Sequence, residues 1–207
     1  MSSQTDIPRK SIYRLSIYQR CLERLRENGL ETVSSNALAK AAGVKSTQLR
    51  KDLAHFGQFG TRGLGYNVEA LIEVITGVLG TNSLVPVILV GVGNLGAALL
   101  RYSGFVKEGF EISAAFEADP NRAKLVKANV PVMDASVMAQ YVNENNVKIA
   151  ILAVPPETAQ EVANNLVQVG VQAFLNFSPT VLKTPDNVIV NSVDLALELE
   201  HLSYFVK

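Results

Sequence analysis

The stretch that decides the fold is Val85-Pro86-Val87-Ile88-Leu89-Val90-Gly91-Val92-Gly93-Asn94-Leu95-Gly96. An apolar, β-branched run of strand length leads into a glycine pattern of the form G-x-G-x-x-G, and a helical pattern follows. In this strand, turn and helix order the pattern is typical of a dinucleotide-binding turn. Gly91 permits a tight turn, Gly93 lets the backbone approach a pyrophosphate, and Gly96 lets the helix pack close to the strand. We expect the first amides of that helix to face the phosphates.

The chain after this turn alternates between strand-like and helix-like segments, which predicts a parallel sheet with crossover helices. Glu117 ends the second expected strand and lies 24 residues after Gly93, an offset at which an acidic side chain accepts hydrogen bonds from the adenosine ribose. Because a carboxylate there would repel a 2′-phosphate, NAD(H) is favoured over NADP(H). Asp119 is a competing candidate, and an ordinary surface glutamate is the other interpretation. The expected strands are 85–90, 110–116, 130–133, 147–154, 172–177 and 188–190.

Ligands of open α/β sheets bind beyond the carboxyl ends of the strands. Two more strand ends are therefore predicted to lie beside the nucleotide, although both are also compatible with ordinary loops. They are Val154-Pro155 and Asn176-Phe177-Ser178-Pro179. The cofactor-binding residues predicted from these patterns are Gly91, Val92, Gly93, Asn94, Leu95, Gly96, Glu117, Val154, Pro155, Asn176, Phe177 and Ser178.

The cofactor region shows no apparatus for catalysis. A hydride-transfer enzyme needs a proton donor near the carbonyl, yet the histidines of the chain are His55 and His201, far from the glycine turn in sequence. No Cys/His cluster indicates a metal. The sequence therefore predicts a protein that binds a dinucleotide and is not an enzyme.

Two alternatives from other classes stay open. A small NAD-dependent oxidoreductase with a basic adaptor domain would use the same turn, but nothing in the sequence suggests its substrate. A module that reads another nucleotide, such as a CoA-type ligand, is the second, because a fold does not fix its ligand.

The residues before the turn predict a DNA-binding unit. Helical patterns cover 12–28, 36–42 and 47 to about 56. Ser34-Ser35 supplies an N-cap for the second helix, and Ser46 is expected to cap the third. Two short helices joined by a turn that contains glycine form a helix-turn-helix layout.

The third helix separates an apolar stripe from a polar face. Leu49, Leu53 and Phe56 point inward, which leaves hydroxyl, amide and cationic groups on the exposed side, where they suit base edges and phosphates. An ordinary solvated face is the alternative. The predicted DNA-binding residues, including two from the segment that follows, are Lys45, Ser46, Thr47, Gln48, Arg50, Lys51, Thr61 and Arg62.

That following segment, 56–67, sets four glycines among aromatic residues, with Arg62 near the tip. It predicts a tight β-hairpin, or wing, and Arg62 is suited to a minor groove, whose negative potential attracts guanidinium groups. A flexible linker is less consistent with so many apolar side chains. A helix over 68–79 follows, and Gly80-Thr81-Asn82-Ser83 is the expected boundary. The predicted domains are 1–80, 81–191 and a C-terminal helix within 192–207.

Charge and composition agree with this division. Of 19 Lys and Arg and 19 Asp and Glu, residues 1–80 hold 11 and 7, a charge of +4, and residues 81–207 hold 8 and 12, a charge of −4. The basic first part is the one expected to meet a polyanion. The sequence contains no run of about 18 or more apolar residues, so it predicts no membrane span. The polar N-terminus and the single cysteine, Cys21, lead us to expect a cytoplasmic protein.

The last predicted helix runs from Leu195 to about Phe205, with Ser192 or Asp194 as its cap. Leu195, Leu199, Leu202 and Phe205 line one face of it. A helix this apolar requires a partner surface, either on its own domain or on a second chain.

With both halves read, the chain closely resembles the Rex family of redox-sensing transcriptional repressors over nearly its whole length. The union of a winged helix with the glycine motif is highly specific for that family. The motifs that carry the resemblance are Leu49-Arg50-Lys51-Asp52-Leu53 with Phe56-Gly57, Gly60-Thr61-Arg62-Gly63-Leu64-Gly65-Tyr66, Gly91-Val92-Gly93-Asn94-Leu95-Gly96, Ala150-Ile151-Leu152-Ala153-Val154-Pro155 and Leu175-Asn176-Phe177-Ser178-Pro179.

The resemblance implies an α/β Rossmann-like domain preceded by an all-α, winged-helix DNA-binding domain, in a homodimer that exchanges its C-terminal helices. It implies binding to AT-rich promoter palindromes, release by NADH, and binding that NAD⁺ tolerates or favours. Family switch positions map to Arg14, Tyr102 and Asp194, with Tyr102 near the nicotinamide ring. Glu117 departs from the family pattern, which has Asp there, and its longer arm is still expected to reach the ribose.

Overall fold

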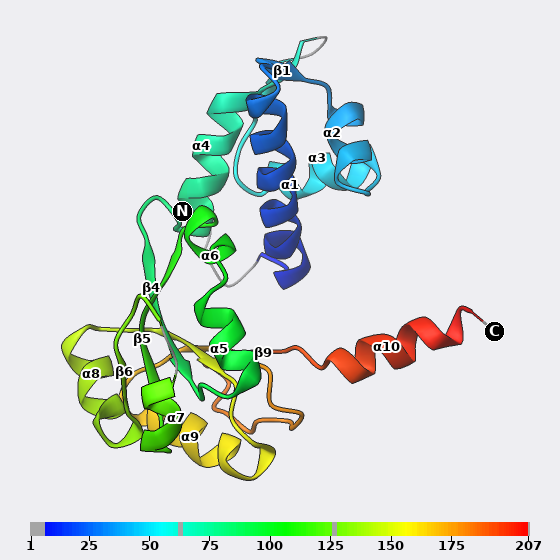
Figure 1. Cartoon of the computed structure of the whole chain (residues 1–207). Coiled ribbons are helices and arrows are strands. Elements are labelled where there is room, and N and C mark those ends of the chain that lie inside the picture. The colour runs from blue at the N-terminus through cyan, green and yellow to red at the C-terminus, as the bar shows by residue number, and fades with distance from the viewer. Residues whose placement is uncertain (1–6, 62–63, 126–127, 207) are drawn as a thin grey trace. The chain divides into compact units, whose positions relative to one another are not determined.

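The computed structural model describes residues 7–61, 64–125 and 128–206. The chain forms two compact units, separated between Ser83 and Leu84 (Figure 1). Arg62, the predicted tip of the wing, lies outside the described residues.

The first unit combines a helix-turn-helix, α2 and α3, with a small antiparallel sheet in the order β1-β3-β2. The hydroxyl of Ser34 caps α2 by accepting from the amide of Ala37 at 3.1 Å, as expected. The cap expected at Ser46 is wrong, because α3 already includes Ser46, and Lys45 stands at the N-cap without a side-chain bond. The elements are α1 Arg9–Glu27, β1 Thr32–Val33, α2 Ser35–Ala41, α3 Ser46–Ala54, β2 Gly60–Thr61, β3 Gly65–Asn67 and α4 Val68–Leu79.

One apolar core holds this unit together. Helices α1, α3 and α4 each contribute the inward stripe that their periodicity predicts, and β1 and β3 close the core with Val33 and Tyr66. The fully or nearly buried helix residues include Leu15, Tyr18, Leu22, Leu49, Leu53, Leu71, Ile72 and Ile75.

The second unit is a six-stranded parallel sheet in the order β6-β5-β4-β7-β8-β9. Counted along the sheet, this is the 3-2-1-4-5-6 order of dinucleotide-binding domains, in which ligands bind where the order reverses, between β4 and β7. All six expected strands are present. The strands are β4 Val85–Val90, β5 Phe110–Glu117, β6 Val132–Asp134, β7 Ile149–Leu152, β8 Ala173–Asn176 and β9 Ile189–Ser192.

Helices cover both faces of this sheet (Figure 1). Strand β4 is buried on both sides: Ile88 and Val90 face a core that includes α8 and α9, while Val87 and Leu89 face a second core that includes α5 and α6. A strand buried on two faces has a nearly continuous apolar sequence, which explains the run before the glycine turn. The helices are α5 Asn94–Leu100, α6 Gly104–Lys107, α7 Pro120–Leu125, α8 Met138–Glu144 after a 3₁₀ turn at Ala135–Val137, α9 Pro156–Gln168 and α10 Leu195–Tyr204.

The last helix, α10, leaves its apolar side chains in solvent. Asp194 caps it by accepting from the amides of Ala196 and Leu197 at 2.9 and 3.2 Å. The leucines of α10 and Phe205 are 58–68% exposed, so the described part of the chain provides no cover for this face. Within the described residues, no helix is both long and apolar enough to cross a membrane.

Candidate cofactor cleft and nucleic-acid interface

Two glycines of the turn are required by the fold itself. Gly91 has φ +91°, and a Cβ added to it would lie 2.5 Å from the carbonyl oxygen of Ala153 at the end of β7. A Cβ on Gly96 would collide with the carbonyl oxygen of Gly91. Gly91 therefore makes the turn and Gly96 lets α5 approach it, as the motif predicts.

Gly93 is different, because nothing in the chain fills the space beside it. Its φ of −63° suits any residue, and the nearest atom to an added Cβ is Nη1 of Arg122 at 3.8 Å. The fold alone does not explain a glycine here. A ligand that comes close to the backbone does, so the turn fits the pyrophosphate of a dinucleotide.

Glu117 is held against this turn by three backbone amides. Its Oε2 accepts from the amide of Val92 at 2.9 Å, and its Oε1 accepts from Ala118 and Asp119 at 2.9 and 3.0 Å. The side chain is long enough to reach back from the end of β5 to the turn. A carboxylate fixed here suits ribose hydroxyls and disfavours a 2′-phosphate.

A cleft of about 760 Å³ opens over the carboxyl ends of β4, β5 and β7. Predicted residues that line it are Gly91, Gly93, Asn94, Leu95, Glu117, Val154 and Pro155. The sequence did not single out Met138, Arg122, Thr158 or Glu161, which also line it. Thr158 and Glu161 lie in α9, which directly follows Pro155. Their closeness in sequence to this predicted residue was the one indication that they line the cleft.

Asn176 and Ser178 brace the cleft from behind and do not line it. Both are buried. The amide of Asn176 donates to the carbonyls of Ser178 and Thr180 at 3.1 and 3.0 Å, and the hydroxyl of Ser178 donates to the carbonyl of Val154. Phe177 and the turn residues Val92 and Gly96 also lie outside the lining. The buried bonds hold the end of β7 in place beside the loop after β8.

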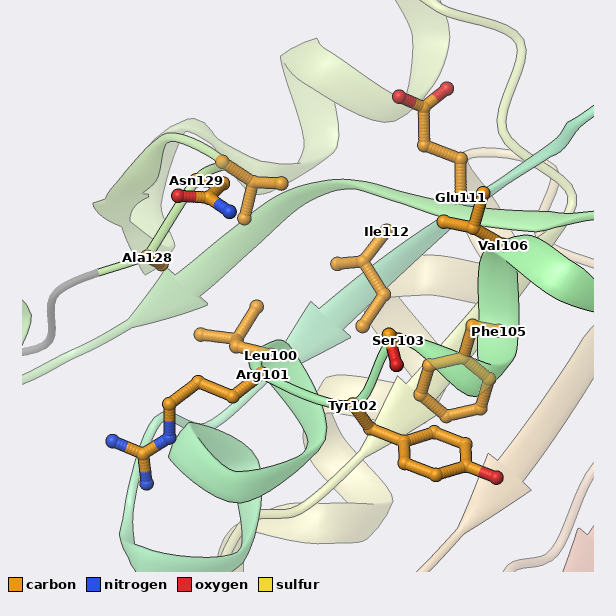
Figure 2. Close-up of a pocket in the computed structure, with 11 residues that line it drawn as sticks. Leu100, Arg101, Tyr102, Ser103, Phe105, Val106, Glu111, Ile112, Ala128 and Asn129 are labelled. Carbon is orange, nitrogen blue, oxygen red and sulfur yellow. The ribbon is translucent and has the colours of Figure 1, made fainter.

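Tyr102 lies on a separate pocket of about 590 Å³ (Figure 2). Its ring packs edge-on against Phe105, with the ring centroids 5.1 Å apart, and it is 60% exposed. The ring covers Gly104, because a Cβ there would collide with it. Tyr102 does not line the glycine cleft in this structure, so its predicted place near the nicotinamide requires the side chain to move.

The exposed face of α3 presents the groups expected of a recognition helix. Lys45, Thr47, Arg50 and Lys51 are exposed, and Nη1 of Arg50 also donates to the hydroxyl of Ser35 at 3.2 Å. Gln48 is only half exposed. Thr61 ends β2. Lys45, Arg50 and Lys51 are therefore accessible to phosphate, while Gln48 has an internal partner.

That partner is Asp52, a buried carboxylate that the sequence pattern did not mark as a site residue. It accepts from the hydroxyls of Ser11 and Tyr18 at 2.9 and 2.8 Å and from the amide of Gln48 at 3.0 Å. Arg14 adds two bonds, from Nε at 2.5 Å and Nη2 at 2.7 Å. The sequence feature that could have indicated this cluster is a carboxylate beside the apolar stripe of α3, one turn after Gln48.

The charges of this cluster support one another. Burial alone would raise the pKa of Asp52, but the hydrogen bonds from Arg14, Tyr18, Gln48 and Ser11 outweigh it and lower the pKa to about 2. Burial, and then the bond to Asp52, raises the pKa of Tyr18. Arg14, a predicted switch residue, is thus engaged within the DNA-binding unit.

The two units together define a class of protein, a helix-turn-helix DNA-binding unit joined to a dinucleotide-binding domain. The family model described as "Putative DNA-binding protein N-terminus" matches residues 6–54, and the one described as "CoA binding domain" matches 82–180. The redox-sensing transcriptional repressor Rex of Carboxydothermus hydrogenoformans is 47% identical over 97% of each chain. The Rex of Pelotomaculum thermopropionicum is 46% identical over 96% of this chain and 93% of its own. The chain belongs to the Rex family of redox-sensing transcriptional repressors.

Two solved structures resemble this chain over nearly its whole length. RSP in complex with β-NAD⁺ and operator DNA has a TM-score of 0.91 and 39% identity, and covers 98% of this chain and 94% of its own. RSP in complex with β-NADH has a TM-score of 0.86 and 37% identity, and covers 98% and 95%. The relatives are named as repressors and not as enzymes, so the family is one of regulators.

Proposed function

We propose that this chain represses transcription by binding promoter DNA as a homodimer, and that it leaves the DNA when NADH occupies the glycine cleft. The observation that carries this proposal is the likeness, over nearly the full chain, to RSP in its operator complex with NAD⁺ and in its complex with NADH. The open space at Gly93 beside a fixed Glu117 carboxylate supports it from the chain's own geometry. We place the protein in the cytoplasm, where promoter DNA and NADH are both available.

In the DNA complex, α3 enters a major groove. Thr47 and Gln48 read base edges, and Lys45, Arg50 and Lys51 bind mainly phosphates. Arg62 enters the adjacent minor groove of an AT-rich site. Two-fold symmetry then requires a palindrome whose half-sites lie one helical turn, or a multiple of it, apart.

In the cofactor complex, the amides at the start of α5 bind the pyrophosphate, and Glu117 accepts hydrogen bonds from the ribose hydroxyls. Val154 and Pro155 border the nicotinamide half of the cleft. The ring supplies the signal, because its oxidised form is cationic and its reduced form is neutral and apolar. Glu117 makes NADPH the poorer ligand.

The apolar face of α10 packs on the partner subunit, where it lies between the DNA-binding unit and the dinucleotide-binding unit of that partner. Asp194 at its start, Arg14 and Tyr102 form the switch in this proposal. Arg14 is bonded to Asp52, and the Tyr102 ring packs against the Phe105 ring, so each side chain must exchange one partner for another. A shift from 1:99 to 99:1 between two dimer states requires about 5.5 kcal/mol of differential binding.

The test is operator binding by the full chain, measured by fluorescence anisotropy on an AT-rich palindrome with and without NADH, NAD⁺ and NADPH. We expect DNA binding that NADH abolishes, that NAD⁺ leaves intact, and that NADPH affects only at much higher concentration. Equal DNA affinity in saturating NADH and NAD⁺ would refute the proposal.

A CoA-type ligand is the second candidate, because the family model that matches residues 82–180 is described by CoA binding. The same titration with CoA separates the two ligands. Glu117 argues for a dinucleotide, since the 3′-phosphate of a CoA ribose would meet a fixed carboxylate. Release of the operator by CoA, and not by NADH, would favour the second candidate.

A further inference from the structure

The charges that line the glycine cleft are unbalanced for an anionic ligand. Three carboxylates line it, those of Glu117, Asp119 and Glu161. Among the described residues that line the cleft, Arg122 is the one with a cationic side chain. A dinucleotide brings two negative charges on its pyrophosphate, and the amides of the turn are neutral donors. The single guanidinium is therefore the group best placed to offset those charges.

Arg122 is also positioned at the point where the pyrophosphate is expected. It projects from α7, the helix that follows β5, and its Nη1 is the nearest atom to the empty space beside Gly93, 3.8 Å from an added Cβ. The open backbone of Gly93 and the guanidinium thus border the same space from two sides. These two observations come from different elements, the turn after β4 and the helix after β5.

The arginine is held loosely and remains available. Its Nε lies 4.0 Å from Oδ2 of Asp119, and its side chain is 62% exposed. The other oxygen of Asp119 accepts from the amide of Asn121 at 2.9 Å at the start of α7. Asp119 therefore aims Arg122 along the rim of the cleft through a weak ion pair, and a stronger anion can replace it.

We propose that Arg122 is a cofactor-binding residue that closes over the pyrophosphate at the glycine turn. The turn amides bind one side of the pyrophosphate, and the planar guanidinium binds phosphate oxygens from the other side with charge-assisted hydrogen bonds. This inference rests on the proposed function, because it names a further residue of the same cofactor site. It assigns to α7 a part in cofactor affinity, separate from the ribose contact of Glu117.

The test is a titration of the full-length protein with three ligands of decreasing phosphate content: NADH, ADP and adenosine. One variant is Arg122→Met, which keeps an unbranched side chain but removes the charge. The other is Arg122→Lys, which keeps the charge but loses the planar guanidinium that can donate two parallel hydrogen bonds. Lys124→Met is the matched control, since Lys124 is an exposed cation of the same helix outside the cleft lining. Melting temperatures verify that each variant is folded.

We expect Arg122→Met to weaken NADH and ADP about 10- to 100-fold, as for a lost hydrogen bond to a charged group. Adenosine affinity should stay unchanged, Arg122→Lys should fall between, and Lys124→Met should match the wild type. The NADH concentration that releases DNA should rise by the same factor as the dissociation constant.

Two outcomes would overturn the inference while the proposed function survives. One is NADH binding by Arg122→Met within twofold of the wild type. The other is an equal loss for adenosine, which would mean that the guanidinium stacks on the adenine. A wild-type protein that does not bind NADH would overturn the inference together with the proposed function.

Discussion

At the scale of single residues, the three glycines of the turn serve different ends. Gly91 and Gly96 have neighbours that exclude a side chain, whereas a methyl group at Gly93 meets only Arg122 at an ordinary contact distance. Gly91 and Gly96 are therefore required for folding, whereas we propose that Gly93 is required for cofactor binding.

We expect Gly93→Ala to fold with a melting temperature close to that of the wild type but to lose NADH binding, because the methyl group occupies the space of the pyrophosphate. Gly96→Ala is the contrasting variant, and it should be strongly destabilised by the collision with the carbonyl of Gly91. Thermal unfolding and NADH fluorescence measure the two effects. Undiminished NADH affinity in Gly93→Ala would contradict this account of the turn.

Asp52 provides the second residue-scale prediction, which concerns pH. Its pKa in the folded chain is about 2, against an ordinary value of 3.8. A carboxyl whose pKa is lowered on folding stabilises the fold above its unfolded pKa, and this stabilisation is lost as the pH falls from about 4 toward 2. The difference in pKa corresponds to about 2 kcal/mol.

We expect Asp52→Asn to destabilise the first unit by about 2–4 kcal/mol at pH 7, because Arg14 loses its ion-pair partner in a largely buried site. The variant should also lack the extra loss of stability between pH 4 and pH 2. Hydrogen exchange of the α1 and α3 amides reports both quantities. If wild type and variant lose stability in parallel below pH 4, Asp52 is not the titrating group.

At the scale of elements, α3 and α10 differ in how they are held. The Asp52 cluster ties α3 to α1 through side chains of both helices, so the orientation of the recognition helix is fixed by a polar network as well as by the apolar core. Helix α10 has the opposite character, since its leucines lie open to solvent. In the proposed homodimer, α10 is the element through which the second subunit is held.

We expect the double variant Leu199→Asp, Leu202→Asp to be monomeric in analytical ultracentrifugation at concentrations where the wild type is a dimer. Both leucines are exposed in the single chain, at 68% and 58%, so the charges cost little within one subunit but are buried at the interface. Operator affinity should fall because two half-sites are no longer bound together. Glu198→Gln and Glu200→Gln on the same helix serve as controls. A variant that remains dimeric would show that α10 does not hold the subunits together.

At the scale of the whole molecule, the sequence predicts the order of elements well. The six strands and the helix-turn-helix can be predicted from the spacing of apolar residues and from the glycines at the turns, because both depend on local backbone geometry. The cap of α3 fails at the level of one residue. A serine near a helix start can stand on either side of the boundary, and here Ser46 is already helical.

The candidate site is predictable only in part. Gly93 and Glu117 have fixed offsets along the chain, so their positions follow from the motif. Arg122 and Asp52 become site residues through the way separate elements meet, which no spacing in the sequence reports. Asn176 illustrates the reverse case, since a polar residue at a strand end looks the same whether it faces the ligand or braces the loop behind it.

The cap of α10 has a mechanical consequence for the proposed switch. Both cap bonds use Oδ1 of Asp194, so they hold the carboxylate at a fixed angle and leave Oδ2 for an incoming donor. A hydroxyl or guanidinium that donates to Oδ2 therefore binds a carboxylate that is fixed to the first turn of α10, and not a freely rotating side chain. A small displacement of Asp194 would therefore move the whole of α10 as a rigid body. In the proposed dimer, this is how the redox state of one nicotinamide ring could change the positions of two DNA-binding units.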